Sequence, residues 1–169
     1  MLKKYLSLVI VAIVALSSLA LAQTSKVDKN GFLSRFVGTW KGEGKITGLD
    51  ARIVMSWENV LDGKFIRLSF RNEMRKKDGG MQVFDAYAYY KAIDEQKYKG
   101  SWFDSGGELH PLDATVEGNA LNTLWGTAET KLGRTIYRLV DEKKMEVVDS
   151  IRLKDGTWRE FGRAVYARQ

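Results

Sequence analysis

Few residues in this chain have the side-chain chemistry that catalysis needs. The sequence contains one histidine, His110, and no cysteine, so thiol chemistry and cysteine-based metal sites are excluded. A Ser-His-Asp triad would have to use His110, and no Gly-x-Ser-x-Gly motif is present. His110 shares an alternating face with Leu112 and Ala114 and is therefore predicted to point inward from a strand. An enzyme is the less favoured interpretation.

His110 itself can be interpreted in two ways. A lone histidine on an apolar face is commonly a hydrogen-bonded residue of a core or rim, and Pro111 after it indicates a strand edge or a bulge. Alternatively the imidazole contacts a ligand, so His110 is kept as a candidate ligand-binding residue. The segment Glu108-Leu109-His110 falls far short of a metal-ligand pattern, and no metal site is predicted.

Acidic and phenolic side chains alternate in the segment 81–91. Asp85, Tyr87 and Tyr89 share one strand face. If that face points inward, Asp85 becomes a buried acid that needs a partner or has a raised pKa. Asp149 and Glu160 raise the same question, and the alternative is that these acids contact water at strand ends. The candidate partners of an inward acid are three arginines: Arg67, Arg138 and Arg163.

Five tryptophans are spread over the chain. Trp57, Trp102 and Trp125 lie in strand-like segments, where their rings either line an aromatic cavity or fill it. With the residues weighed above they complete the predicted ligand-binding set, which is Trp57, Asp85, Tyr87, Tyr89, Trp102, His110 and Trp125.

Alternation of apolar and polar residues recurs along the chain and predicts the strands that must position these side chains. Ahead of the strands, Asp28 suits an N-cap and Phe32, Leu33 and Phe36 have helical spacing, so a short helix is expected to close one end of a barrel. The expected strands are 36–47, 50–61, 64–75, 81–91, 97–104, 108–117, 120–128, 133–141, 144–153 and 157–168.

The links between the expected strands are short and rich in turn residues. Asp62-Gly63 and Asp155-Gly156 are strong hairpin signals. Short links make neighbouring strands antiparallel, because a parallel pair needs a crossover of about a dozen residues or more. Closure into a barrel then removes the exposed edges. The predicted fold is all-β: a single antiparallel up-and-down barrel of about ten strands with a short N-terminal helix.

Residues 1–22 have the order of an export signal, with Lys3 and Lys4, an apolar core and a small-residue cleavage site that ends at Ala22. The apolar run is shorter than the roughly 20 residues that span a bilayer. We therefore expect a cleaved signal peptide (1–22), one β-barrel domain (23–169), no membrane span after cleavage, and a periplasmic or secreted location.

The formal net charge is +6, and the basic residues are interspersed with acidic ones. Arg75-Lys76-Lys77 is the one basic cluster and adjoins Asp78, so a nucleic-acid partner is not expected. Because an exported chain without cysteine has no disulfides, its stability must come from packing.

The segment 36–44, FVGTWKGEG, resembles the first strand of the lipocalin-like calycins, in which Gly-x-Trp opens the barrel. It is especially similar to the nitrobindin-type opening and to uncharacterised bacterial secreted lipocalin-like proteins. The resemblance implies that Trp40 packs under a basic residue of the last strand, a role for Arg163 or Arg168. Gly38, Trp40 and Arg163 are the expected structural residues. Alternation independently places Trp40 on the inner face.

The resemblance also raises the question of haem, which nitrobindins bind through a histidine near the C-terminal end of the barrel. The expected last strand, 157–168, contains no histidine. Only an unusual tyrosine ligand or His110 could replace it. No cofactor is therefore predicted.

Three functions are compatible with this sequence. The leading hypothesis is an exported barrel that binds a small hydrophobic or amphipathic molecule in its lumen. The second is a protein-interaction module whose barrel is filled by side chains. The third is a lipocalin-like enzyme that uses His110 or an acid in the lumen. The sequence does not indicate an oligomeric state.

Overall fold

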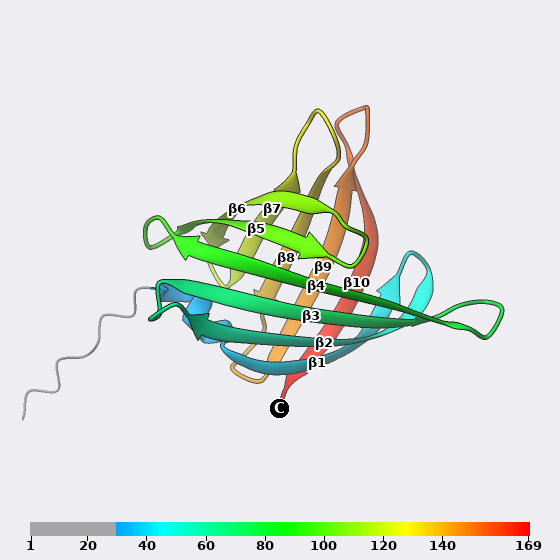
Figure 1. The fold of residues 1–169 in the computed structure, drawn as a ribbon, viewed down its shortest axis with the longest axis horizontal. Coiled ribbons are helices and arrows are strands. Elements are labelled where there is room, and N and C mark those ends of the chain that lie inside the picture. The colour runs from blue at the N-terminus through cyan, green and yellow to red at the C-terminus, as the bar shows by residue number, and fades with distance from the viewer. Residues whose placement is uncertain (1–29) are drawn as a thin grey trace, which may run out of the picture.

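The computed structural model describes residues 30–169, which form a short 3-10 helix followed by ten antiparallel strands (Figure 1). The predicted signal peptide and the predicted N-cap Asp28 lie outside the described residues. The elements are η1 Gly31–Phe36, β1 Gly38–Ile46, β2 Leu49–Val60, β3 Phe65–Arg75, β4 Met81–Ala92, β5 Lys97–Asp104, β6 Leu109–Glu117, β7 Ala120–Gly126, β8 Leu132–Leu139, β9 Lys144–Arg152 and β10 Trp158–Arg168.

The ten strands close into one barrel in which each strand pairs with its sequence neighbours and β1 pairs with β10. The closing register runs from Trp40 opposite Arg168 to Ile46 opposite Gly162. Both Asp-Gly links form hairpin turns, and in the second the Thr157 amide donates to Asp155 Oδ1 over 2.9 Å. The predicted all-β up-and-down barrel is confirmed.

Alternation along the strands sends apolar side chains into the barrel. On β1, Trp40 faces inward as predicted and is fully buried. Gly42 lies on the same face, where a Cβ atom would come within 2.4 Å of the Tyr166 ring. Glycine at this position therefore lets a large ring of β10 lie flat against β1. The largest fully buried side chains are Trp40, Trp57, Tyr90, Tyr98, Phe36, Leu33, Ile53, Met55, Ile66, Leu68, Leu121 and Met145.

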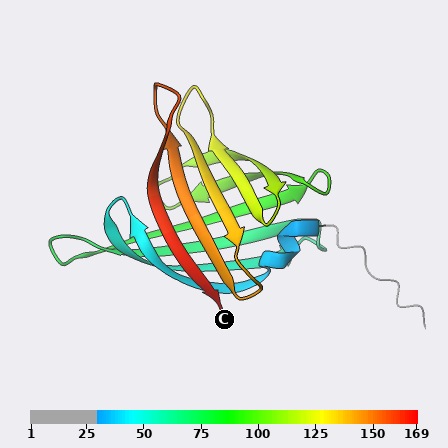
Figure 2. The ribbon, with the colours of Figure 1, turned by 180° about the vertical axis from the view of Figure 1, so that it is seen from behind.

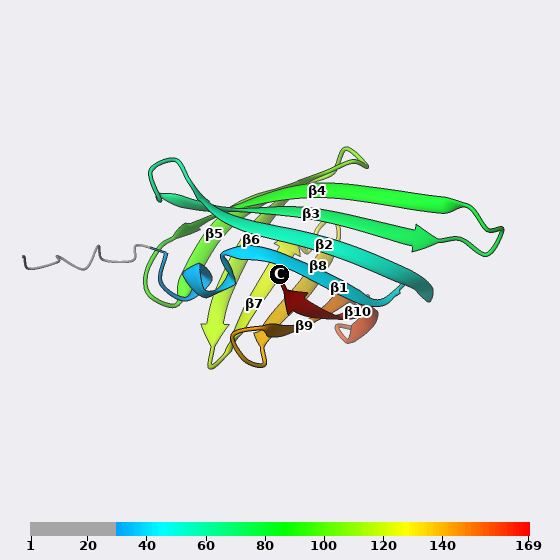
Figure 3. The ribbon, with the colours of Figure 1, turned by 90° about the horizontal axis from the view of Figure 1, so that it is seen from below.

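The helix η1 covers one end of the barrel, as Figure 3 shows from below. It buries Leu33 and Phe36. The Tyr98 hydroxyl donates to the Asn30 carbonyl over 2.8 Å, and Trp40 Nε1 donates to the Phe36 carbonyl over 2.7 Å. These contacts confirm the predicted helical plug, whose helix is of the 3-10 type.

The opposite end carries the hairpin loops β1–β2, β3–β4, β5–β6, β7–β8 and β9–β10. In Figure 1 the β3–β4 hairpin projects to one side, while the β7–β8 and β9–β10 hairpins project upward. The barrel thus has one end covered by η1 and an opposite end formed by these hairpin loops.

No helix among residues 30–169 is long and apolar enough to cross a membrane.

The C-terminal end of β10 is tied to η1, and Figure 2 shows both at the same end of the barrel. The Arg168 guanidinium lies 4.3 Å from the centroid of the Trp40 ring and donates to the carbonyls of Arg35, Val37 and Glu142. Arg163 instead pairs with Glu160 on the outer face, with 2.7 Å between Nη2 and Oε2. Of the two arginines expected to cover Trp40, Arg168 does so. The prediction of Arg163 as a structural residue beside Trp40 is wrong, because its side chain points outward.

Replacing Arg168 with lysine is expected to lower the free energy of unfolding by about 1–3 kcal/mol, because an ammonium cannot span three carbonyls and cover an indole ring at once. The matched change Arg163→Lys affects an exposed pair and is expected to cost less than about 0.5 kcal/mol. Urea denaturation of both variants measures the difference. Equal losses would mean that Arg168 does not anchor η1.

Candidate functional site

A cavity of about 440 Å³ occupies the lumen on the side of the hairpin loops. Each of the ten strands contributes at least one lining side chain. Thr47, Gly106, Glu108 and Lys131 reach it from the connecting loops and form its rim. The volume lies in the lower part of the range of small-molecule sites, about 300–1,000 Å³. The barrel is therefore hollow at this end and packed with side chains next to η1.

Aromatic rings form one wall of the cavity. The Trp102 ring stacks on Phe84 with 6.4 Å between centroids, and Phe70 lies 5.9 Å from Trp102. Trp102 Nε1 donates to Asp104 Oδ2 over 3.0 Å, which fixes the orientation of the indole. Such a wall offers flat apolar surface to a planar ligand.

Trp125 and His110 form a second aromatic group on β7 and β6. Their ring centroids are 5.5 Å apart, and Lys131 Nζ lies 5.6 Å from the centroid of the Trp125 ring. A Cβ atom on Gly133 would come within 1.9 Å of the Trp125 indole. The glycine on β8 thus makes room for the indole to lie against its backbone.

Polar groups lie among the apolar residues that line the cavity. The Thr135 hydroxyl donates to Asp149 Oδ1 over 2.6 Å. Burial raises the pKa of Asp149 to about 6, against the opposing effect of the Thr135 hydrogen bond. Burial also raises the pKa of Tyr90 to about 12 and that of Tyr137 well above its ordinary value. Both phenols are protonated at neutral pH and can donate hydrogen bonds.

Asn72 contributes a further polar group from β3. Its side chain is 2% exposed and lines the cavity, yet its Oδ1 has no hydrogen-bond partner in the protein. A buried acceptor without a partner costs about 1–3 kcal/mol. A donor on a bound molecule would remove this penalty.

The structure brings three of the predicted ligand-binding residues to the cavity. Trp102, His110 and Trp125 line it. Trp57 is also inside the barrel, but it is 1% exposed and packed against Phe36, away from the lining. Its ring belongs to the packed end of the lumen.

The expectation that Asp85, Tyr87 and Tyr89 line the lumen is wrong. Tyr87 is 51% exposed, and Asp85 accepts two hydrogen bonds of 3.0 Å from Arg71 on the outer surface. The opposite face of β4, with Phe84, points inward. The inner face of β4 carries Phe84, Ala86, Ala88 and Tyr90, whereas Asp85, Tyr87 and Tyr89 lie on the outer face.

The arginines proposed as partners of an inward acid pair elsewhere or lie on the outer surface. Arg67 donates to Glu58 over 2.7 Å, and Arg163 pairs with Glu160. Arg138 donates to Asn119 Oδ1 over 3.1 Å. Of the three acids weighed from the sequence, Asp149 is the one that lines the cavity. In the described part of the chain, no lysine or arginine forms a salt bridge with it.

Several cavity residues were not in the predicted set. Asn72 alternates with Phe70 and Met74, so period two could have found it once the inward face of β3 was known. The sequence analysis weighed Asp149 as an inward acid. Its sequence pattern does not distinguish an inward acid from one that contacts water at a strand end. Within residues 30–169, no three potential metal-ligating side chains lie together. His110 Nε2 and Glu108 Oε2 are 3.9 Å apart.

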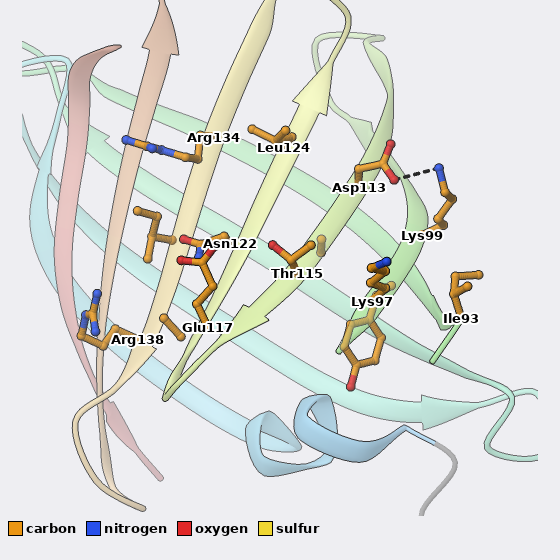
Figure 4. A pocket seen from close by; sticks show the side chains of 14 residues that line it. Ile93, Lys97, Lys99, Asp113, Thr115, Glu117, Asn122, Leu124, Arg134 and Arg138 are labelled. Atoms are coloured by element: carbon orange, nitrogen blue, oxygen red, sulfur yellow. Dashed lines mark ion pairs between the residues drawn. The ribbon is translucent and has the colours of Figure 1, made fainter. Parts of the chain in front are cut away.

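A second hollow, of about 470 Å³, lies on the outer face of β5 to β8 (Figure 4). Charged and polar side chains such as Lys97, Thr115 and Arg138 stand around it, and Lys99 pairs with Asp113 over 2.8 Å. It is a trough between long solvated side chains on a sheet surface. The lumen, with its aromatic walls and buried polar atoms, is the better candidate site.

Comparison with solved structures gives weak likenesses in sequence. The crystal structure of Rv2717c from M. tuberculosis matches at a TM-score of 0.55 and 18% identity, covering 81% of this chain and 94% of that one. The structure of EF1p2_mFAP2b bound to DFHBI matches at a TM-score of 0.48 and 7% identity, covering 83% and 99%. The first likeness supports the barrel fold alone.

No curated protein matches the chain. A family model, in contrast, matches residues 27–168, which include the whole barrel. The chain therefore belongs to the family described as protein of unknown function DUF1579.

Proposed function

We propose that this protein is an exported, lipocalin-like carrier that holds a small amphipathic molecule in the lumen of its barrel. The observation that carries the proposal is the cavity of about 440 Å³ in a closed barrel, lined by aromatic rings and by buried polar atoms. An apolar pocket with a few inward polar groups is the usual form of a small-molecule site. The export signal predicted for residues 1–22 supports a role outside the cytoplasm.

The alternative of a side-chain-filled interaction module fits the cavity less well. Side chains fill the end next to η1, where Trp57, Phe36 and Tyr137 are in ring contact, but they do not fill the end with the hairpin loops. An enzyme would use Asp149 or His110, and both line the cavity. The carrier needs fewer assumptions, because binding requires only the walls that are present.

The first test is native mass spectrometry of the mature protein purified from its own source. A reproducible added mass would support the carrier and identify its cargo. A bare polypeptide mass after gentle purification, together with no binding of the probe below, would contradict it.

A filled lumen is expected to lose ligand binding. The probe is N-phenyl-1-naphthylamine, a neutral aromatic molecule whose emission rises in apolar surroundings. Leu112 lines the cavity, so Leu112→Trp places an indole in the space and is expected to weaken probe binding at least about tenfold. Fluorescence titration measures the dissociation constant.

The matched control is Leu124→Trp on the outer face of β7, where the side chain lies in the trough of Figure 4. It adds the same indole outside the barrel and is expected to leave the dissociation constant unchanged. Weakening by Leu124→Trp but not by Leu112→Trp would place the probe on the outer surface.

A further inference from the structure

We propose that the lumen selects small aromatic amines: the Asp149 carboxylate binds the ammonium group, and the Asn72 side-chain carbonyl accepts a second N–H or O–H of the ligand. This inference rests on the proposed carrier function and names the chemical class of its cargo. It comes from the charges and unpaired atoms of the cavity.

The cavity is acidic. Three carboxylates, of Asp104, Glu108 and Asp149, line it together with one lysine, Lys131, and no arginine is among its described lining residues. A fatty acid or another carboxylate would thus enter an acidic lumen with Lys131 at the rim as its one ammonium partner. A cation would instead be attracted.

Of the three carboxylates, Asp149 has the least compensation, because the Glu108 side chain is 67% exposed and therefore hydrated. Asp104 accepts hydrogen bonds from Trp102 Nε1 and from the amides of Gly106 and Glu108. These three donors in and beside the β5–β6 turn stabilise its negative charge. Asp149 accepts one hydrogen bond, from Thr135. A half-buried carboxylate in the lumen that lacks a cation favours a positively charged partner. An ammonium group on the ligand would supply that charge.

Asn72 gives independent evidence for a donor-bearing ligand. Asn72 lines the cavity, and its Oδ1 is buried and lacks a partner in the protein. β3 and β9 are separated by β2, β1 and β10 around the ring, so Asn72 and Asp149 lie on different walls of the lumen. A ligand between these walls is held at two points.

The aromatic wall determines the remainder of the ligand. Phe70, Phe84 and Trp102 present neighbouring rings to the cavity. A planar ring on the ligand stacks on such a wall, while the ammonium group reaches Asp149 across the lumen. A flat molecule with an amino side chain therefore matches the walls better than a long alkyl chain.

The test compares tryptamine with indole-3-propionate by isothermal titration calorimetry on the mature protein at neutral pH. Both carry the same indole N–H and differ in the charge of the side chain. Tryptamine is expected to bind at least about tenfold more tightly, since charged hydrogen bonds are the stronger ones. Equal or tighter binding of the propionate, or no binding of either probe, would overturn the inference.

Variants separate the two contacts. Asp149→Asn keeps the shape and is expected to weaken tryptamine binding about 10- to 100-fold, whereas Asp113→Asn on the outer face leaves it unchanged. Asn72→Leu is expected to weaken tryptamine about threefold to tenfold and to leave 1-methyltryptamine, which lacks the indole N–H, unaffected. Unchanged tryptamine binding by Asp149→Asn would contradict the assigned role. Circular dichroism and the melting temperature confirm that each variant is folded.

The result is distinguishable from failure of the carrier function. A carboxylate or neutral cargo in the native mass spectrum would leave the carrier standing and overturn amine selectivity. A bare polypeptide that binds neither tryptamine nor N-phenyl-1-naphthylamine would overturn both.

Discussion

Replacing Trp57 with alanine is expected to lower the free energy of unfolding by about 3–5 kcal/mol, the usual cost of truncating a fully buried tryptophan. The indole is 1% exposed. Its ring centroid lies 5.3 Å from those of Phe36 and Tyr137 and 5.8 Å from that of Tyr90. The ring thus joins η1 to β4 and β8, and its removal leaves a cavity that the rigid barrel cannot close. Urea denaturation followed by far-ultraviolet circular dichroism measures the loss.

Phenylalanine at the same position separates ring packing from hydrogen bonding. Trp57 Nε1 is buried without a hydrogen-bond partner, so Trp57→Phe removes no hydrogen bond and is expected to cost far less than Trp57→Ala. Trp40→Phe, in contrast, removes the 2.7 Å hydrogen bond to the Phe36 carbonyl and is expected to cost about 1 kcal/mol more than Trp57→Phe. Equal losses for Trp57→Phe and Trp57→Ala would show that ring packing is not what Trp57 contributes.

The fold was predictable because its evidence is local. Alternation marks each strand, and the short links, such as Asp62-Gly63, leave antiparallel neighbours as the main option. The predicted helical plug was likewise confirmed, because Leu33 and Phe36 have a spacing that puts both on one side of a short helix.

The site was less predictable because it depends on which face of each strand points inward. On β4 both faces carry aromatic residues, and a shift of one residue exchanges them. The inner face holds Phe84, Ala86, Ala88 and Tyr90, so the size of the side chains on β4 does not by itself identify it. Which face of β4 points inward depends on how the strand packs against the side chains of the neighbouring strands. The charge of the lumen could not be predicted for the same reason. Asp85 and Asp149 have similar sequence surroundings, but Asp85 points outward and Asp149 points inward.

Asp149 is expected to lower the stability of the empty barrel, although the proposed amine site needs its charge. We expect Asp149→Asn to raise the free energy of unfolding at pH 7.5 by about 1–3 kcal/mol. A carboxyl pKa of about 6 in place of the ordinary 3.8 corresponds to roughly 3 kcal/mol, and water in the lumen lowers the penalty. Asparagine keeps an oxygen for the Thr135 hydroxyl and carries no charge to bury.

The pH dependence has a defined sign. Because the pKa of Asp149 is raised in the folded state, its favourable contribution is complete below about pH 3.8 and is lost as the pH rises through about 6. The Thr135 hydroxyl donates a hydrogen bond to the Asp149 carboxylate. The nearby phenols of Tyr90, Tyr137 and Tyr166 remain protonated over this pH range. The Glu160 carboxylate raises the pKa of Asp149 further.

Stability measured by denaturation at several pH values should therefore diverge between the parent and Asp149→Asn from about pH 4 to 6 and differ by a constant amount above that range. Asp113→Asn is the exposed control and should show no such divergence. A parent stability that does not fall relative to Asp149→Asn across this window would mean that the carboxylate is not desolvated. If the gain in stability appears together with the loss of tryptamine binding, Asp149 lowers the stability of the empty barrel while it serves the bound amine.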